Sequence, residues 1–366
     1  MLYNTIGDAG IKLSAISFGA MRWPSEQACH DIINHGLDLG LNYVDTSTGY
    51  VGGQSERWTG QAVARRRGEI LFSSKCAFGR APRADEVRRS IDASLAATGL
   101  ECFDFYQLWG LQADEQLREA LAKGGFVEGV RRAQADGLVR LGLGFTFHGP
   151  ADLFRAAVDS GHFLCATVSY NLMNRKEEEQ IVYAAAHGVG IIVMNPLGGG
   201  VLALAGDRSL DFLRDGERGP HHNALRFLLA NRGITSSIVG FRAVEEVDQA
   251  VAALAGADAL TEGFRRGLAA RMDAVQLSRS DLCTGCGYCK DCPQGSNPSK
   301  FMQAMRDFIR YSVSAGDLER WIWSQYPHAD PIKDLQLCSE CGQCEQKCPQ
   351  HLQIVEHIRR AKKAML

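Results

Sequence analysis

The stretch ILFSSKCAFGRAPRADEVRRSIDASLAATGLECFDFYQL, residues 70–108, places a helical segment between two apolar runs. The runs ILFSSK (70–75) and CFDFYQL (102–108) are short and largely apolar, as parallel strands covered on both faces are. The segment ADEVRRSIDASLAATG between them repeats apolar residues about every 3.6 positions, which is typical of an amphipathic helix. The stretch therefore predicts one strand–helix–strand unit of an α/β fold.

The same unit recurs along most of the chain. Eight strands alternating with helices over about 270 residues predict a (β/α)8 barrel, the TIM-barrel fold. A doubly wound sheet is the competing fold, but no strand–GxGxxG–helix element opens the chain. We expect the barrel to occupy residues 1–276. The six further strands are expected at AISFGAM (15–21), YVDTS (43–47), VRLGLGF (139–145), ATVSYN (166–171), GIIVMNP (190–196) and SSIVGF (236–241).

The composition is that of an ordinary globular protein. Of the 366 residues, 45% are hydrophobic and 22% are charged, and the formal net charge is −2. This balance, with no long basic block, gives no reason to expect a nucleic-acid partner. The N-terminal residues lack the pattern of a signal peptide, and no apolar run approaches the roughly 18 residues that a bilayer requires. We therefore expect a cytoplasmic protein without membrane contact.

Eight of the twelve cysteines lie in two runs, CTGCGYCKDCP (283–293) and CSECGQCEQKCP (338–349). Their abundance in a chain without an export signal indicates metal or redox chemistry instead of disulfides. Closely spaced thiolates hold three corners of a 4Fe–4S cluster, and a fourth cysteine followed by proline usually binds the other cluster. We predict one 4Fe–4S cluster on Cys283, Cys286, Cys289 and Cys348, and a second on Cys338, Cys341, Cys344 and Cys292.

Structural zinc is the alternative for these cysteines. It favours paired C-x2-C units separated by longer gaps, whereas each run here has four cysteines and ends in proline. The first run is one residue shorter than the bacterial ferredoxin spacing, so Cys292 is its least regular ligand. Residues 277–366 are expected to form a separate small α-helical domain, which resembles the two-cluster ferredoxins of succinate dehydrogenase iron–sulfur subunits and heterodisulfide reductases.

Three residues of the barrel form a candidate acid–base site. Reacting groups of such barrels lie at the C-terminal ends of the strands. Asp45 ends the second predicted strand, Tyr50 follows on its loop, and Lys75 ends the third. A lysine paired with an aspartate stays charged beside a phenol and lowers the phenol's pKa toward a useful range. The sequence therefore predicts Tyr50 as a proton donor or acceptor.

Five segments of the barrel carry a resemblance to a known family. The segments NYVDTSTGYVGGQSE, ILFSSK, GLGFTFHG, VSYNLMNR and NPLGGGVLA resemble successive landmarks of the aldo-keto reductases over residues 1–255. With the two cysteine runs added, the whole chain resembles the iron–sulfur branch of that superfamily. The resemblance implies NADPH-dependent carbonyl reduction by Tyr50, tuned by Asp45 and Lys75. It also implies that Asn171 contacts the carboxamide of nicotinamide.

Three positions depart from the family pattern. Trp109 stands where the family has a carbonyl-orienting histidine, and Met194 where it has a tyrosine that stacks on nicotinamide. Glu246 occupies the place of the arginine that binds the 2′-phosphate. His148, after the fifth strand, is a candidate for the missing imidazole, with helix capping as the competing role, and Arg242 is a candidate for the missing phosphate contact. The resemblance alone therefore does not establish an NADP(H) or NAD(H) site.

Two further loop features each allow more than one interpretation. Gly198, Gly199 and Gly200, after the seventh strand, either let the backbone approach a phosphate or form only a tight turn. His221 and His222 open the next helix and are expected to face solvent. Neither feature decides between the functions.

Three functions remain open on the sequence. The preferred one is an iron–sulfur oxidoreductase acting on a small carbonyl or hydroxyl compound, including sugar-like ones, with a ferredoxin- or flavodoxin-like redox partner. The second is a non-redox lyase or isomerase that uses the same acid–base residues for dehydration or epimerisation. The third is a redox relay or sensor. The first is preferred because direct hydride transfer from NADPH needs no cluster, so two clusters favour single-electron traffic.

Overall fold

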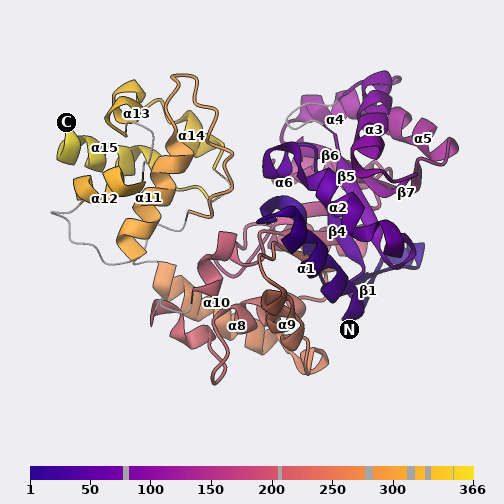
Figure 1. Ribbon diagram of the computed structural model, residues 1–366, viewed down its shortest axis with the longest axis horizontal. Coiled ribbons are helices and arrows are strands. Elements are labelled where there is room, and N and C mark those ends of the chain that lie inside the picture. Colours follow the sequence, from indigo (N-terminus) through magenta and orange to yellow (C-terminus); the bar gives the residue numbers. More distant parts are fainter. Residues whose placement is uncertain (77–81, 205–207, 277–282, 311–317, 326–330, 349) are drawn as a thin grey trace. The chain divides into compact units, whose positions relative to one another are not determined.

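The computed structural model describes residues 1–366 apart from 77–81, 205–207, 277–282, 311–317, 326–330 and 349. The chain divides into two compact units. The barrel unit comprises Met1–Pro196 and His222–Leu268, and the C-terminal unit comprises Leu197–His221 and Ala269–Leu366. All strands of the described residues lie in the barrel unit, and the C-terminal unit consists of helices and loops (Figure 1).

Eight parallel strands close into a barrel in the order β10-β3-β4-β5-β6-β7-β8-β9. Each predicted strand is found within a few residues of its expected place, so the (β/α)8 prediction is confirmed. The strands are β3 (Ile16–Gly19), β4 (Tyr43–Asp45), β5 (Leu71–Lys75), β6 (Phe103–Leu111), β7 (Val139–Phe147), β8 (Cys165–Ser169), β9 (Gly190–Met194) and β10 (Ser236–Val239).

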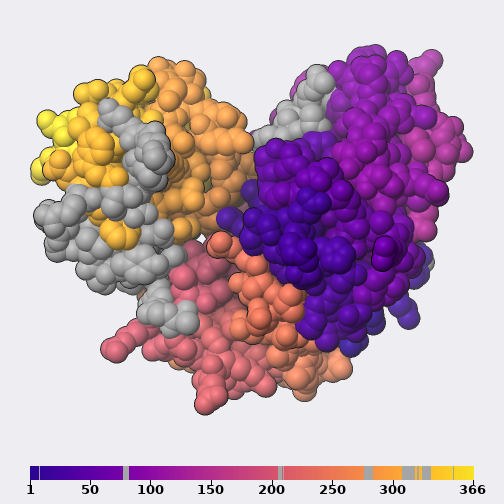
Figure 2. Space-filling view, in the orientation of Figure 1, coloured from indigo at the N-terminus to yellow at the C-terminus, as the bar shows by residue number. Residues whose placement is uncertain are grey.

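Helices that follow the strands in sequence form the outer layer, and Figure 2 shows one face of the molecule's surface. The helices are α1 (Glu26–Asp38), α2 (Ser55–Val63), α3 (Ala84–Thr98), α4 (Asp114–Leu121), α5 (Phe126–Ala135), α6 (Ala151–Asp159), α7 (Glu178–Ala186), α8 (His221–Leu229), α9 (Val244–Ala252) and α10 (Glu262–Gln276).

Helix α3 shows how the sequence produces these layers. Val87, Ile91 and Leu95 recur every four residues, lie on one face and are buried. Burying such a side chain stabilises the fold by roughly 1.5–3 kcal/mol. The helix ends at Gly99, whose φ of 69° is left-handed and terminates the helix without strain. The apolar residues that recur about every 3.6 positions in the sequence therefore form the buried face of this helix.

An N-terminal hairpin precedes the barrel, and the sequence analysis did not predict it. It consists of β1 (Tyr3–Ile6) and β2 (Ile11–Ser14), which pair antiparallel. Its Ile6 and Leu13 are fully buried in one apolar cluster with residues of the barrel strands. The hairpin therefore completes the core at one end of the barrel. The other buried members of the cluster are Tyr43, Phe105, Cys165, Ile192 and Ile238.

The C-terminal unit is helical, as the sequence predicts. Its apolar core includes Phe301, Met305, Ile322 and Ile358. Five cysteines belong to this cluster or pack against it: Cys283 and Cys348 are buried members, and Cys289, Cys338 and Cys344 are partly buried. Within the described residues, no helix is both long and apolar enough to cross a membrane. The helices are α11 (Pro298–Arg310), α12 (Leu318–Gln325), α13 (Pro331–Leu337), α14 (Gln343–Gln346) and α15 (Ile354–Met365).

Candidate functional site

A buried ion pair joins the ends of two neighbouring strands. Lys75, the last residue of β5, donates from Nζ to Asp45 Oδ1 at 2.6 Å and to the Thr46 carbonyl at 2.8 Å. The side chains of Lys75 and Asp45 are only 1% and 2% exposed. Two charges so far from water persist only when each compensates the other. The predicted pairing of Asp45 and Lys75 is therefore present in the barrel.

Tyr50 lies beside this pair, on the short 3₁₀ helix η3 (Tyr50–Gly53). The Lys75 ammonium lies 5.1 Å from the centroid of the Tyr50 ring, and the Trp109 ring meets the Tyr50 ring edge-on at 5.7 Å. The next residue, Val51, has a φ of 52°, which is strained for a β-branched side chain. Such strain clusters at functional sites. The structure thus brings together four of the predicted residues.

The pKa of Tyr50 is raised well above its usual value, first by burial and then by the negative charge of Asp45. The sequence analysis expected Lys75 to lower this pKa, and that expectation is wrong. The charge of Lys75 is already compensated by Asp45, at 2.6 Å. Tyr50 is therefore a neutral phenol at physiological pH, in the form that donates a proton.

Gln107 is a component of the site that the sequence analysis missed. It lies in β6 opposite Lys75 of β5 and is fully buried. Its Nε2 donates to Asp45 Oδ2 at 2.7 Å and to Ser73 Oγ at 2.8 Å, and its Oε1 accepts from Thr167 Oγ1 at 2.8 Å. Gln107 thereby fixes the oxygen of Asp45 that Lys75 leaves unbound. A polar residue inside the apolar run FDFYQL was the available signal.

We predict that Gln107→Leu lowers the free energy of unfolding by about 1–3 kcal/mol, because it leaves buried polar partners unsatisfied. The measurement is urea denaturation followed by circular dichroism. The matched control is Gln27→Leu, since Gln27 is exposed on α1 and bonds only within that helix, to Asp31. Equal stability of the Gln107→Leu variant and the control would contradict the network.

His148 follows β7 directly and is half-buried. Its backbone N–H donates to the Leu111 carbonyl at 3.0 Å. Burial, with a smaller effect of the Lys176 charge, lowers the pKa of His148 to about 3. The imidazole is therefore neutral near pH 7, where it can form hydrogen bonds but cannot serve as an acid. Its role as a replacement for the family histidine stays a prediction.

Asn171 and Arg242 lie after β8 and β10, at the same end of the barrel as the acid–base residues. Asn171 is fully buried: its Oδ1 accepts the N–H groups of Met173 and Asn174, and its Nδ2 donates to the Asn195 carbonyl at 2.9 Å. Arg242 is exposed, and its backbone N–H donates to Glu246 Oε2 at 2.7 Å. Both residues are thus at the predicted positions, with their contacts inside the protein.

The eight cysteines of the C-terminal unit line two cavities. The first encloses about 330 Å³, part of it open to solvent, and is lined by four cysteines: Cys283, Cys286, Cys289 and Cys348. The second encloses about 380 Å³ and is lined by five cysteines: Cys289, Cys292, Cys338, Cys341 and Cys344. Cys289 lines both cavities, so the two are adjacent. Each cavity contains a cysteine from the distant run.

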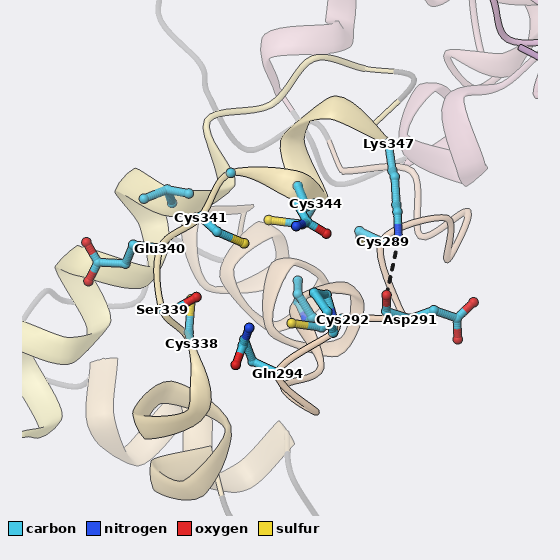
Figure 3. A pocket seen from close by; sticks show the side chains of 15 residues that line it. Cys289, Asp291, Cys292, Gln294, Cys338, Ser339, Glu340, Cys341, Cys344 and Lys347 are labelled. Carbon is cyan, nitrogen blue, oxygen red and sulfur yellow. Dashed lines mark hydrogen bonds between the residues drawn. The ribbon is translucent and has the colours of Figure 1, made fainter. Parts of the chain in front are cut away.

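Figure 3 shows the second cavity, with the sulfur atoms of Cys292, Cys341 and Cys344 directed into the space between them. Cys341 is exposed, so this cavity opens to solvent. Lys347 also lines it and donates from Nζ to the Asp291 carbonyl at 3.2 Å. This bond ties the two cysteine runs together at the rim.

Hydrogen-bond donors surround the sulfurs of the first cavity. Burial raises the pKa of the Cys283 and Cys286 thiols, and the N–H groups of Gly285 and Tyr288, which bond to the two sulfurs, act in the opposite direction. Across the described residues, no group of three or more His, Cys, Asp or Glu side chains is arranged to hold a single metal ion. Three closely spaced cysteines with a fourth from a distant segment, as around the first cavity, are the ligand pattern of a 4Fe–4S cluster.

The class of protein follows from the two units together. Acid–base residues at the C-terminal strand ends of a closed barrel are typical of barrel enzymes. Two neighbouring cavities lined by cysteines are typical of an iron–sulfur module. Residues 15–262 match the aldo/keto reductase family, and residues 282–353 match the 4Fe-4S dicluster domain. The chain belongs to the aldo/keto reductase family and is an oxidoreductase that carries a 4Fe-4S dicluster domain.

Individual relatives agree with this placement. The L-galactose dehydrogenase of Arabidopsis thaliana is 26% identical over 294 residues, which cover 70% of this chain and 89% of that protein. The uncharacterized oxidoreductase YqkF of Bacillus subtilis is 21% identical over 212 residues, covering 55% and 67%. Among solved structures, the aldo-keto reductase AKR11C1 from Bacillus halodurans (holo form) is 22% identical with a TM-score of 0.63, covering 74% of this chain and 96% of its own. That structural likeness supports the barrel fold.

Proposed function

We propose that the chain oxidises or reduces a small carbonyl or hydroxyl compound, with Tyr50 exchanging the proton at the substrate oxygen. The observation that carries the proposal is the buried Lys75–Asp45 pair, whose ammonium lies 5.1 Å from the Tyr50 ring. A neutral phenol carries the proton that the oxygen of a carbonyl needs as that oxygen gains charge. Trp109 packs against the Tyr50 ring and would present an apolar surface beside the substrate.

We further propose that the cysteines of each cavity are the ligands of one 4Fe–4S cluster. The support is that each cavity combines three closely spaced cysteines with cysteines from the other run: Cys348 in the first cavity, and Cys292 together with the shared Cys289 in the second. When bound, such clusters supply single electrons. The residues proposed to hold them are Cys283, Cys286, Cys289 and Cys348 for the first cavity, and Cys338, Cys341, Cys344 and Cys292 for the second.

The residues at the expected nucleotide site do not fit a 2′-phosphate. The first turn of α9 carries Glu245 and Glu246, and Glu246 already accepts the Arg242 N–H at 2.7 Å. A helix N-terminus attracts an anion only where no carboxylate occupies it. These carboxylates disfavour the 2′-phosphate of NADP(H) but not the 2′-hydroxyl of NAD(H), and we assign no step to either nucleotide. Reduction of a carbonyl consumes two electrons and two protons, and we propose that the electrons come from a ferredoxin- or flavodoxin-like partner.

The test is the Tyr50→Phe variant in anaerobic protein with intact clusters. We expect the turnover of a carbonyl substrate to fall about 10²–10⁴-fold, the usual contribution of a positioned acid. A panel of sugars and related carbonyl compounds is the first choice, because one relative is an L-galactose dehydrogenase. Turnover is measured with a chemically reduced viologen as electron donor. The matched control is Tyr183→Phe, since Tyr183 is an outer residue of α7 that bonds to Asp159.

The alternatives predict other results in the same assay. A lyase or isomerase would convert substrate without any electron donor, and Tyr50→Phe would still inactivate it. A relay or sensor would tolerate Tyr50→Phe. Either result would overturn the proposed oxidoreduction at Tyr50.

A further inference from the structure

The turn after β9 belongs to the C-terminal unit, although its sequence lies within the barrel region. Leu197–His221 groups with Ala269–Leu366. At Gly199 the backbone has a φ of 65°, and a Cβ placed there would lie 2.0 Å from the Thr284 carbonyl oxygen. It would also lie 2.6 Å from the Thr284 carbonyl carbon. No side chain fits such a space, so the two backbones touch.

Thr284 is part of the first cysteine cavity. It follows Cys283, lines that cavity and is 2% exposed. Its buried hydroxyl lies beside the sulfur of Cys286. The carbonyl that meets Gly199 is therefore in the loop that positions two of the cysteines.

The same loop is held from a second direction by α11. Arg306 donates from Nη1 to the Cys283 carbonyl at 3.1 Å, and a Cβ on Gly285 would lie 3.3 Å from the side chain of Gln303. The loop of Cys283–Cys286 thus has close neighbours on α11 and at Gly199. Displacing one of them shifts the sulfurs that the loop carries.

We propose that the turn Gly198–Gly200 is a structural part of the first cluster site and holds the Thr284 carbonyl so that Cys283 and Cys286 face the cavity. This inference rests on the proposed cluster ligands. Groups that orient ligands in this way affect metal binding nearly as strongly as the ligands themselves. The turn is then no phosphate-binding loop, which was one of the two roles open on the sequence.

The test compares Gly199→Ala with Gly200→Ala in the full chain purified without oxygen. Gly200 has a φ of 95°, so alanine is strained at both positions, but a Cβ on Gly200 meets nothing within 4 Å. Only Gly199→Ala therefore adds a clash with Thr284. We expect Gly199→Ala to lose the first cluster, about four of about eight irons, and Gly200→Ala to retain both. Iron and sulfide are counted, and reduced samples are compared by electron paramagnetic resonance.

Thr284→Val keeps the shape of the loop but removes the hydroxyl. We expect it to retain the iron and to change the resonance signal of one cluster only. If Gly199→Ala fails to fold, the result for Thr284→Val is used in its place. Full iron with unchanged spectra in both Gly199→Ala and Thr284→Val would overturn the proposal, as would equal iron loss in the two alanine variants. A wild-type protein that contains zinc and no iron would instead overturn the cluster assignment itself.

Discussion

Replacing Cys348 by alanine is expected to remove about four of about eight irons and to leave one cluster intact. Cys348 lines the first cavity with cysteines that precede it by about sixty residues, and it lies in the sequence run of the second. Cys292 is expected to behave reciprocally, because it lines the cavity of Cys338, Cys341 and Cys344. Iron counting alone does not distinguish this crossed arrangement from one in which each run binds its own cluster.

Two double variants distinguish the arrangements. With crossed ligands, Cys286→Ala/Cys348→Ala damages the same cluster twice, so about four irons remain, whereas Cys286→Ala/Cys292→Ala loses both clusters. With each run binding its own cluster, the two results are exchanged. Cys29→Ala is the control, because this cysteine is buried in α1 of the barrel and should retain all the iron.

The strands were predictable because their apolar runs are both local and periodic. Parallel strands covered on two faces need apolar runs, so the position of each strand in the sequence could be inferred without knowledge of tertiary contacts. The β1–β2 hairpin was not predicted because each strand has only four residues and no regular alternation of buried and exposed positions. Such a short pattern is common outside sheets. Its burial arises only when the barrel supplies the apolar cluster beneath it.

The candidate site was predictable where strand ends determined it. Asp45 and Lys75 end neighbouring strands, and the register pairs Asp45 with Ser73, two residues before Lys75. To predict the role of Gln107, one needs the register between β5 and β6 and the position of Thr167 on β8. No single segment of the sequence encodes this information. His222 was expected to face solvent, but it is 1% exposed. Adjacent residues of a helix turn to different faces, and polarity alone did not indicate which histidine points inward.

The grouping of Leu197–His221 with the C-terminal unit was beyond sequence reasoning. The three glycines of its turn suited a phosphate loop as well as a tight turn. The structure distinguishes the two roles because Gly199 lies so close to the Thr284 backbone that no side chain fits between them. A contact between segments about 85 residues apart leaves no periodic signal in either of them.

Replacing Lys75 by methionine is expected to lower the free energy of unfolding by about 3–5 kcal/mol, because it leaves Asp45 as an uncompensated buried charge. Burial then favours the protonated carboxyl, so the pKa of Asp45 in the folded variant should rise above its value in the unfolded chain. A raised folded pKa means that the folded state binds more protons. The deficit of the variant should therefore shrink as the pH falls and grow as it rises.

The double variant Asp45→Asn/Lys75→Met removes both charges. We expect it to be more stable than Lys75→Met alone, since replacing a whole buried pair is often nearly neutral. Urea denaturation followed by far-ultraviolet circular dichroism measures each variant, with cluster absorbance reporting separately on the C-terminal unit. Glu26→Gln, which removes the exposed ion pair with Arg57, is the control and should change little. Asp45→Asn alone completes the cycle. If the losses of stability in Asp45→Asn and in Lys75→Met simply add in the double variant, Asp45 and Lys75 are energetically independent, and this result would contradict the acid–base site proposed around Tyr50.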